Sequence, residues 1–463
     1  MHGAALSGID AAKSLLGGEC VSDAVDDECE LPVVVIGAGA AGLFAASTAL
    51  HLHESTSDTT VSKDTTGRRP RRVVVLEATE RHGGRVHTVT LPHHTSTNTA
   101  VDESSPQSHS DTDTITRTHI HTEDTECSSV RVDLGASWLQ QFPDNFLAEK
   151  AEKLGLKLHP TDFQSALCAA SDGVPTTDLH TVVEELCDVA LEQVANMGSS
   201  IECKCESSKC GECSSAIRDM SIVDALLPYI SSLPHSHKRE AMLALCGDIN
   251  SDFGYSLHNT SARHSLLELG IGNNDHYIQQ GYNALLDPVA SELDIRYNTP
   301  VSLVDWSNSE CVSVVTASGE VIRASHCICT VPVSVLKDPN TLKFVPQLPH
   351  SHMRALTHIH QGKCEKVVLQ FSTRWWPHST NGMYRWYDNA PHSNSSSGDL
   401  PILDWNEWLD MTECVGAPVV VGFCVGEEAC AAHHSKSKSD AEIVQDALRA
   451  FQCWAWHRTQ VSE

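Results

Sequence analysis

Residues 33–42, Val-Val-Val-Ile-Gly-Ala-Gly-Ala-Ala-Gly, decide the fold of this chain. The first four are apolar and β-branched and are bounded by Pro32 and Gly37, which predicts a short, buried parallel strand. The Ala-rich run from Leu43 to Leu52 predicts a helix, and Val73 to Leu76 predict a second buried strand. The order strand, glycine turn, helix, strand is that of a βαβ unit.

The glycine turn has the spacing G-x-G-x-x-G. In this pattern Gly37 allows a tight turn, Gly39 lets the backbone approach a pyrophosphate, and Gly42 lets the helix pack on the strand. The helix then directs its positive dipole end at the phosphates. Glu77 ends the second strand and offers a carboxylate suited to ribose hydroxyls. The hexamer alone is a weak signal, but in this context it predicts dinucleotide binding.

Composition sets outer limits on function. The chain has 463 residues, with 32 Lys+Arg against 60 Asp+Glu and a formal net charge of −28. This length corresponds to two or three domains of roughly 150 residues each. No apolar run approaches the roughly 20 residues of a membrane span. The acidic balance argues against a nucleic-acid partner, because phosphates demand a basic face. It is compatible with a cationic substrate, although acidity alone usually means only solubility.

Several segments fall outside this pattern. Residues 1–30 predict a disordered lead-in, and residues 92–129, rich in Ser and Thr, predict a low-complexity insertion. The start has no apolar core of signal-peptide length, so most of the 18 cysteines are expected to be free thiols. The exception is a cysteine-rich loop over 203–213. Cys210 and Cys213 have the C-x-x-C spacing of a metal knuckle, whereas Cys203 and Cys205 suit a tetrahedral metal site less well. We therefore assign no metal to this loop.

Two further segments resemble the signatures of a known family. Residues 77–86, Glu-Ala-Thr-Glu-Arg-His-Gly-Gly-Arg-Val, resemble the second motif of the flavin amine oxidases. Residues 132–139, Val-Asp-Leu-Gly-Ala-Ser-Trp-Leu, resemble the family's next motif. The resemblance implies FAD as cofactor, with an arginine at its phosphates and the backbone of a valine at adenine. The cofactor-binding residues that it implies are Gly37, Ala38, Gly39, Ala41, Gly42, Glu77, Gly84, Arg85, Gly135, Ala136, Ser137, Trp138 and Val301.

The resemblance continues toward the C-terminus through Leu293 to Val301 and Thr330 to Lys337. Residues 366–371, Lys-Val-Val-Leu-Gln-Phe, match the strand that bears the family's active-site lysine. This implies that Lys366 hydrogen-bonds through a water to flavin N5, with Lys363 as a nearby competitor. The subgroup most similar to this chain comprises polyamine oxidases and lysine-specific histone demethylases.

The implied reaction is FAD-dependent oxidation of an amine, and the expected substrate is a small polyamine. Hydride passes to the flavin, and oxygen as acceptor gives hydrogen peroxide and an aldehyde. Trp138 and Gln140 are expected in the substrate pocket. The family commonly has His or Glu at the position of Gln140, and an amide can neither titrate nor supply negative charge. Demethylation of histone lysine is an alternative, whereas the second and third motifs disfavour a plain NAD dehydrogenase.

The resemblance implies an α/β fold with a Rossmann-like FAD-binding domain, discontinuous in sequence, and an α+β substrate-binding domain. We expect the FAD-binding domain over 31–91, 130–160 and 278–345, and the substrate domain over 161–277 and 346–463. The family has a further C-terminal segment with a G-E motif at the flavin, so we expect a truncated chain. A catalytically impaired member is therefore a further alternative. Cytosol is the default compartment, with nucleus and peroxisome left open. Oligomeric state is not predicted.

Overall fold

The computed structural model describes residues 2–16, 31–56, 72–91, 130–140, 145–161, 166–171, 179–198, 219–265, 275–378, 382–387, 404–426, 430–431 and 438–461. The chain divides into two compact units. Unit 1 consists of Met1–Val89, Arg131–Pro160 and Asn274–Gln361. Unit 2 consists of Thr90–Val130, Thr161–Asn273 and Gly362–Glu463.

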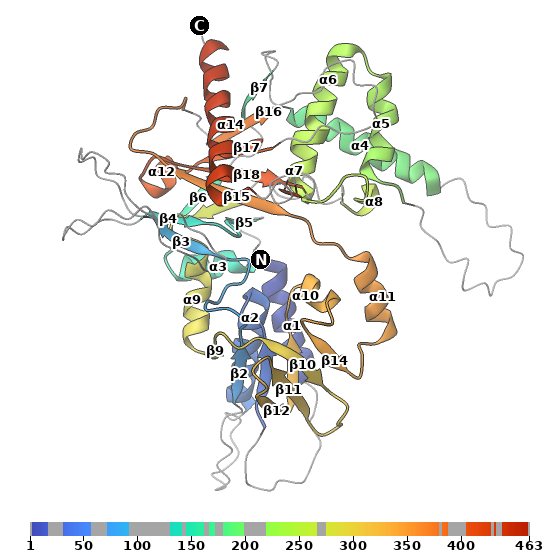
Figure 1. Ribbon diagram of the computed structural model, residues 1–463, viewed down its shortest axis with the longest axis vertical. Coiled ribbons are helices and arrows are strands. Elements are labelled where there is room, and N and C mark those ends of the chain that lie inside the picture. Colours follow the sequence, from blue (N-terminus) through green and yellow to red (C-terminus); the bar gives the residue numbers. More distant parts are fainter. Residues whose placement is uncertain are drawn as a thin grey trace, which may run out of the picture. The chain divides into compact units, whose positions relative to one another are not determined.

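Unit 1 is built on a four-stranded parallel sheet in the order β13-β1-β2-β9. Figure 1 labels β2 and β9 of this sheet. In the central strands β1 (Val33–Ile36) and β2 (Val73–Leu76) every residue is buried. Strand β13 (His326–Cys329) pairs with β1, and β9 (Asp294–Arg296) pairs with β2, both in parallel. Apolar β-branched side chains suit strands that are covered on both faces. Helix α2 (Ala40–Thr56) connects β1 to β2, which confirms the predicted βαβ unit.

Helices cover one face of this sheet and a second sheet covers the other. Val33 and Val35 pack with residues of α2 and α9 (Asn283–Ser291). Val34 and Ile36 pack on the opposite face against the second sheet, because successive side chains of a strand point to opposite sides. The second sheet has the order β12-β11-β10-β14. Its strands are β10 (Val301–Asp305), β11 (Val312–Thr316), β12 (Val321–Ala324) and β14 (Lys343–Val345).

The first residues of the chain form a helix, so the expected disordered lead-in over 1–30 is wrong for its first half. Helix α1 (His2–Leu16) packs along α2 and buries its small residues Ala5, Gly8 and Ala12. A Cβ at Gly8 would lie 2.0 Å from the Ala41 carbonyl oxygen, so the close approach of the two helices requires glycine. These three residues lie on one face of the helix. Their spacing indicates a packed helical face, which the composition of the segment alone does not show. Residues 17–30 lie outside the described residues.

A second correction concerns residues 346–361, which were expected in the substrate domain but belong to unit 1. Helix α11 (His350–His358) packs against α10 (Val333–Lys337). Lys337 Nζ donates a hydrogen bond to the carbonyl oxygen of Ile359 at the end of α11. These contacts hold α11 in unit 1.

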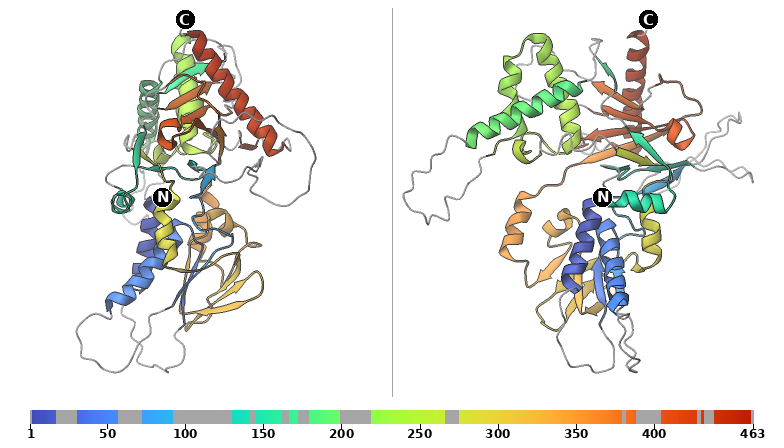
Figure 2. Two further views of the ribbon diagram at one scale, coloured as in Figure 1. Left: turned by 90° about the vertical axis from the view of Figure 1, so that its left-hand side faces the viewer. Right: turned by 180° about the vertical axis from the view of Figure 1, so that it is seen from behind.

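Unit 2 contains a five-stranded sheet in the order β15-β18-β17-β16-β7. Its strands are β15 (Cys364–Gln370), β18 (Val419–Val425), β17 (Glu407–Asp410), β16 (Met383–Tyr387) and β7 (Leu167–Ala170). Helix α14 (Asp440–Val461) covers one face of this sheet (Figure 2). Its residues Phe451 and Trp454 belong to one apolar cluster with Trp408 of β17. Ser439 caps this helix, since its backbone N–H donates to Glu442 Oε2 at 2.8 Å and its Oγ accepts from the Glu442 N–H at 3.4 Å.

Unit 2 also contains a helical layer. It consists of α4 (His180–Gly198), α5 (Ile222–Ser232), α6 (His235–Leu243), the π-helix η1 (Ala244–Ile249), α7 (Asn250–Phe253) and α8 (Ala262–Ser265). An ion cluster joins η1 to the sheet. Arg385 Nε lies 3.2 Å from Asp248 Oδ1, and Arg385 Nη1 lies 3.6 Å from Glu407 Oε2. Tyr387 donates its hydroxyl hydrogen to Asp248 Oδ2 at 3.0 Å.

The remaining described elements are short. They are β3 (Thr88–Leu91), β4 (Val130–Asp133), β5 (Trp138–Leu139), α3 (Phe146–Lys153), β6 (Leu158–Thr161), β8 (Asp275–Ile278) and α12 (Thr412–Val415). The expected insertion over 92–129 and the cysteine-rich loop over 203–213 lie outside the described residues. Within the part of the chain that the structure describes, no group of three His, Cys, Asp or Glu residues could hold a metal. None of the described helices is long and apolar enough to cross a membrane.

Candidate functional site

The glycine turn after β1 has the conformation that its sequence predicts. Gly37 has a φ of +100°, which strongly favours glycine. A Cβ at Gly42 would lie 1.8 Å from the Gly37 carbonyl oxygen, so Gly42 lets α2 approach the turn. Gly39 differs, because the nearest atom to an added Cβ is the Gly83 carbonyl oxygen at 4.0 Å. Space therefore remains beside the Gly39 backbone, as a closely approaching pyrophosphate would need.

The second motif lies directly against this turn. The Gly83 N–H donates to the Ala38 carbonyl oxygen at 2.8 Å, and Gly39 and Gly83 form a parallel β-bridge. Gly84 has a φ of +58°, and a Cβ on it would lie 3.5 Å from the Gly39 Cα. The two glycine segments, separated by more than 40 positions in sequence, thus present bare backbone to the same place. This cradle fits the phosphates of a dinucleotide.

The third motif is joined to the second by backbone hydrogen bonds. The Ala136 N–H donates to the Arg85 carbonyl oxygen at 2.9 Å, and the Leu134 N–H donates to the His87 carbonyl oxygen at 2.8 Å. A Cβ at Gly135 would lie 2.0 Å from the Arg85 carbonyl oxygen, so this close approach requires glycine. All three motifs therefore form one connected surface of unit 1.

Glu77 lies where β2 ends and is buried. Its Oε2 accepts a hydrogen bond from the Ala38 N–H at 2.8 Å. Its Oε1 accepts from the Thr79 N–H at 3.0 Å and from the Thr79 hydroxyl at 2.8 Å. A carboxylate has about four lone-pair directions, so Glu77 retains capacity for a further donor such as a ribose hydroxyl.

Two arginines of the second motif have different roles. Arg81, which sequence reasoning missed, donates through Nη1 to the carbonyl oxygens of Gly84 at 3.0 Å and Val86 at 3.1 Å. Arg81 therefore stabilises the loop through hydrogen bonds to the loop's own backbone. Arg85 is exposed, and no described residue accepts a hydrogen bond from its guanidinium. Arg85 is thus the arginine of this loop that is available to an external anion.

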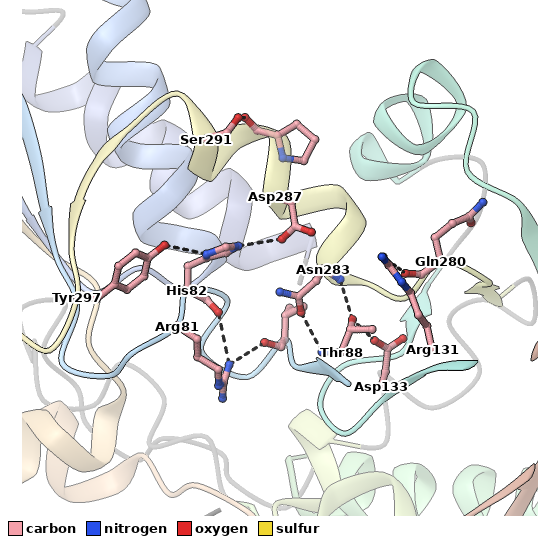
Figure 3. A network of polar contacts seen from close by, with 12 residues as sticks. Arg81, His82, Thr88, Arg131, Asp133, Gln280, Asn283, Asp287, Ser291 and Tyr297 are labelled. Atoms are coloured by element: carbon pink, nitrogen blue, oxygen red, sulfur yellow. Dashed lines mark hydrogen bonds and ion pairs between the residues drawn. The ribbon is translucent and has the colours of Figure 1, made fainter. Parts of the chain in front are cut away.

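Asp133 ties the third motif to the start of α9 (Figure 3). Its buried carboxylate accepts from Thr88 Oγ1 at 2.5 Å and from the Tyr282 N–H at 3.0 Å. Thr88 and Asn283 complete the contact, since the Thr88 N–H donates to Asn283 Oδ1 and the Asn283 N–H donates to Thr88 Oγ1, both at 3.0 Å. A Cβ at Gly281 would lie 2.1 Å from Thr88 Cγ2. Sequence reasoning missed Asp133, although it lies within the quoted motif.

His82 lies next to the paired glycines and contacts two elements at once (Figure 3). Its Nδ1 lies 2.9 Å from the Tyr297 hydroxyl oxygen, and its Nε2 lies 2.9 Å from Asp287 Oδ1. Burial, together with the charges of Glu77 and Asp287, raises the pKa of Tyr297. The histidine thereby fastens the glycine loop to α9 and to the end of β9.

The structure places the other predicted residues of unit 1 around these motifs. Val301 begins β10, and the turn before it reaches Glu77, because the Thr299 N–H donates to the Glu77 carbonyl oxygen at 2.8 Å. Ser137 is buried and Trp138 is half-buried in β5, opposite Tyr277 of β8. Gln140 is exposed, and its carbonyl oxygen accepts from Asn145 Nδ2 at 3.0 Å. Their contacts with cofactor or substrate stay predictions.

Lys366 lies in β15 of unit 2, directly across from Phe423 of β18. Its Nζ lies 5.1 Å from the centre of the Phe423 ring, within cation–π range. Lys363, the competitor, is exposed and precedes the strand. Lys366 belongs to a different unit from the glycine motifs, and its position relative to them stays a prediction.

Unit 1 has the features of an α/β protein with a dinucleotide site. These are the parallel sheet, its glycine turn and the carboxylate at the end of β2. The model of a family described as flavin containing amine oxidoreductase matches residues 117–457. The chain belongs to this family, and FAD is its cofactor. The match begins after the G-x-G-x-x-G turn, so the contact of that turn with the cofactor stays a prediction, which the geometry of the turn supports.

The relatives include two groups of enzymes. Lysine-specific histone demethylase 2 of Homo sapiens is 26% identical over 198 residues, which cover 42% of this chain and 23% of the relative. Polyamine oxidase 4 of Oryza sativa subsp. japonica is 24% identical over 455 residues, which cover 94% of this chain and 76% of the relative. The chain thus spans less than a quarter of the demethylase.

A solved structure confirms the fold. A redesigned putrescine oxidase superposes with a TM-score of 0.57 at 19% identity, covering 92% of this chain and 81% of the solved chain. The predicted α/β class and the arrangement of a flavin amine oxidase are therefore correct.

Proposed function

We propose that this chain oxidises a polyamine such as spermine or spermidine. One C–H and one N–H hydrogen leave the amine, oxygen is reduced to hydrogen peroxide, and water hydrolyses the imine to an aldehyde and a shorter amine. The observation that carries the proposal is the junction of three motifs at Gly39, Gly83 and Ala136, which would form a cradle for FAD. When bound, FAD supplies the hydride acceptor.

Residues of unit 1 would hold the cofactor. The bare backbone at Gly39 and Gly84 would meet the pyrophosphate, and the positive end of α2 would face it. The Arg85 guanidinium would pair with a phosphate, and Glu77 would accept from the ribose. The backbone of Val301 would meet adenine. Each of these groups orients the cofactor and takes no part in bond breaking.

Lys366 would act on protons. A lysine amine beside an aromatic ring can hold a water and move a proton through Nζ. The Phe423 ring restricts where that Nζ can lie. Trp138 would shape the substrate pocket, and Gln140 would hydrogen-bond the substrate without contributing charge. We propose that the protein is cytosolic, with nucleus and peroxisome as the alternatives.

Polyamine is the preferred substrate because the relative named Polyamine oxidase 4 aligns over 94% of this chain. The demethylase match covers less than half of it. Histone-lysine demethylation is therefore the second candidate, and one experiment separates the two.

The experiment uses the full chain reconstituted with FAD. Spermine, spermidine or a dimethyl-lysine peptide is added without oxygen, and flavin absorbance is followed. Oxygen is then admitted and peroxide is measured. Bleaching by a polyamine, followed by one peroxide per turnover, is the expected result. Bleaching by the peptide alone would favour demethylation, and a flavin that no amine bleaches would contradict the proposal.

A further inference from the structure

One row of side chains crosses the five-stranded sheet of unit 2 and contains Lys366. Lys366 of β15 is the register partner of Phe423 of β18, and Phe423 is the register partner of Glu407 of β17. Side chains that are in register on neighbouring strands point to the same face of a sheet. Lys366 and Glu407 therefore lie on one face, with the Phe423 ring between them. Their backbones are two strand spacings, or about 10 Å, apart.

Glu407 is a largely buried carboxylate to which none of the residues described in the structure donates a hydrogen bond. Its side chain is 13% exposed and forms an ion pair with Arg385, but the 3.6 Å between Glu407 Oε2 and Arg385 Nη1 is too long for a hydrogen bond. The Arg385 Nε lies closer to Asp248, at 3.2 Å, and the Tyr387 hydroxyl donates to the same Asp248. Buried polar groups normally have hydrogen-bond partners. Glu407 thus has capacity for a donor that the described part of the chain does not supply.

The charges around Glu407 leave this place negative. Asp248, Asp252 and Glu407 surround the single guanidinium of Arg385. Burial and the charges of Glu407 and Asp248 raise the pKa of Asp252 to about 7, against the opposing effect of Arg385. Even when Asp252 is protonated, two carboxylates share one cation. The donor that suits Glu407 is therefore a cation.

Solvent reaches this face of the sheet. Asp252 is exposed, and so is Cys364, which lies two residues before Lys366 and hence on the same side of β15. Helix α14 packs on the opposite face, against the side chains of Val367 and Trp408. A ligand can thus approach the row that contains Lys366 without displacing α14.

We propose that Glu407 determines substrate specificity by binding a second ammonium group of the amine substrate beside the Phe423 ring. A chain with two or more ammonium groups would place one nitrogen at Glu407 while another lies near Lys366. The face of the Phe423 ring favours a cation next to it. A monoamine has no second cation to offer. This inference rests on the proposed function for the role of Lys366, but binding at Glu407 requires no oxidation and can be measured by itself.

The test measures binding to the full FAD-loaded chain after its flavin has been reduced, so that no amine can be oxidised. Equilibrium dialysis with labelled spermidine gives the dissociation constant. Glu407→Gln keeps the size of the side chain and removes its charge, and it should weaken spermidine binding by about tenfold or more, because a charge-assisted hydrogen bond is lost. Glu365→Gln is the matched control, since Glu365 is adjacent to Lys366 and lies on the opposite face of β15. This control should bind spermidine as wild type does.

Butylamine, which carries one ammonium group, provides a second comparison. Wild type should bind spermidine about tenfold or more tightly than butylamine, because only spermidine can occupy Glu407 and the region of Lys366 together. Glu407→Gln should lose most of this preference. If this variant does not fold, the wild-type comparison decides, and equal affinities for the two amines would overturn the inference.

A structural role for Glu407 predicts a different result. If Glu407 served only to balance Arg385, Glu407→Gln would change the free energy of unfolding and leave the spermidine dissociation constant as in wild type. That result would overturn the inference without touching the proposed oxidation. Conversely, spermidine binding that depends on Glu407, in a chain whose oxidised flavin no amine bleaches, would refute the proposed function and leave the binding site standing.

Discussion

The carboxylate of Glu77 accepts a hydrogen bond from the backbone N–H of Ala38, with 2.8 Å between Oε2 and N. Thirty-nine positions separate the two residues, so this bond fixes the glycine turn after β1 to the end of β2. The group that would hold the ribose thus also shapes the turn that would hold the pyrophosphate. Cofactor affinity should therefore depend strongly on the charge at position 77.

We expect Glu77→Gln to weaken FAD binding by about tenfold, the effect of losing about 1.4 kcal/mol from a charge-assisted hydrogen bond. The amide keeps one acceptor oxygen, so the turn should still form. Quenching of FAD fluorescence by the apoprotein measures the dissociation constant. Glu80→Gln alters an exposed carboxylate of the same loop and serves as the control. Equal dissociation constants for the two variants would contradict the assignment.

Arg85 and Arg81 of the second motif should differ in what their loss affects, which is FAD affinity for Arg85 and apoprotein stability for Arg81. Arg85→Ala should weaken FAD binding by about tenfold or more, because an ion pair to phosphate contributes about 1.5–3 kcal/mol. The melting temperature of the apoprotein should stay unchanged. Arg81→Ala should lower apoprotein stability by about 1–3 kcal/mol, since two backbone carbonyls lose their donor. Calorimetry on both apoproteins tests this, and an unstable Arg85→Ala would show that the roles are reversed.

Lys366→Met should slow reduction of the bound flavin by about 100-fold or more, the usual scale of acid–base catalysis. Methionine keeps an apolar side chain of similar length beside Phe423, so the spectrum of bound FAD should not change. Stopped-flow absorbance under anaerobic conditions measures the rate. Lys363→Met removes the exposed neighbouring lysine and should leave that rate within about twofold. If Lys363→Met slowed flavin reduction more than Lys366→Met does, the proton-transfer role would belong to Lys363.

The sequence could predict those parts of the fold that depend on neighbouring residues. The run Val33–Ile36 forms β1, and Gly37 and Gly42 adopt the predicted turn, because burial and steric demand act within a few positions. The Asp133 contact with Tyr282 spans 149 positions and follows from tertiary register, which no local pattern encodes. Helix α1 is similar, because glycine is required at position 8 only by the close approach of Ala41 in another helix.

Arg385→Met should destabilise the protein by about 3–5 kcal/mol, the cost of leaving buried charge without its partner. The Arg385 side chain is 10% exposed and faces Asp248 and Glu407, which would lose their common cation. Urea unfolding measures the change. Arg72→Met breaks an exposed pair with Asp294, in which the side chains are 63% and 45% exposed, and should cost less than about 1 kcal/mol. Similar losses for the two variants would show that the Arg385 cluster adds no stability of its own.

Stability should fall as pH rises from about 4 to about 7, in part because of Asp252. Burial, reinforced by the charges of Glu407 and Asp248 and opposed by Arg385, raises the pKa of Asp252 to about 7. In that interval the folded chain holds a proton that the unfolded chain has released, so the free energy of unfolding decreases with increasing pH.

Asp252→Asn removes this proton and should be more stable than wild type at about pH 8, but not at about pH 4. The side chain keeps contact with solvent, so we expect a gain of only about 1–2 kcal/mol. Urea unfolding at both pH values tests this, with Asp188→Asn, an exposed position of α4, as control. A gain of equal size at both pH values would show that Asp252 does not titrate in this interval.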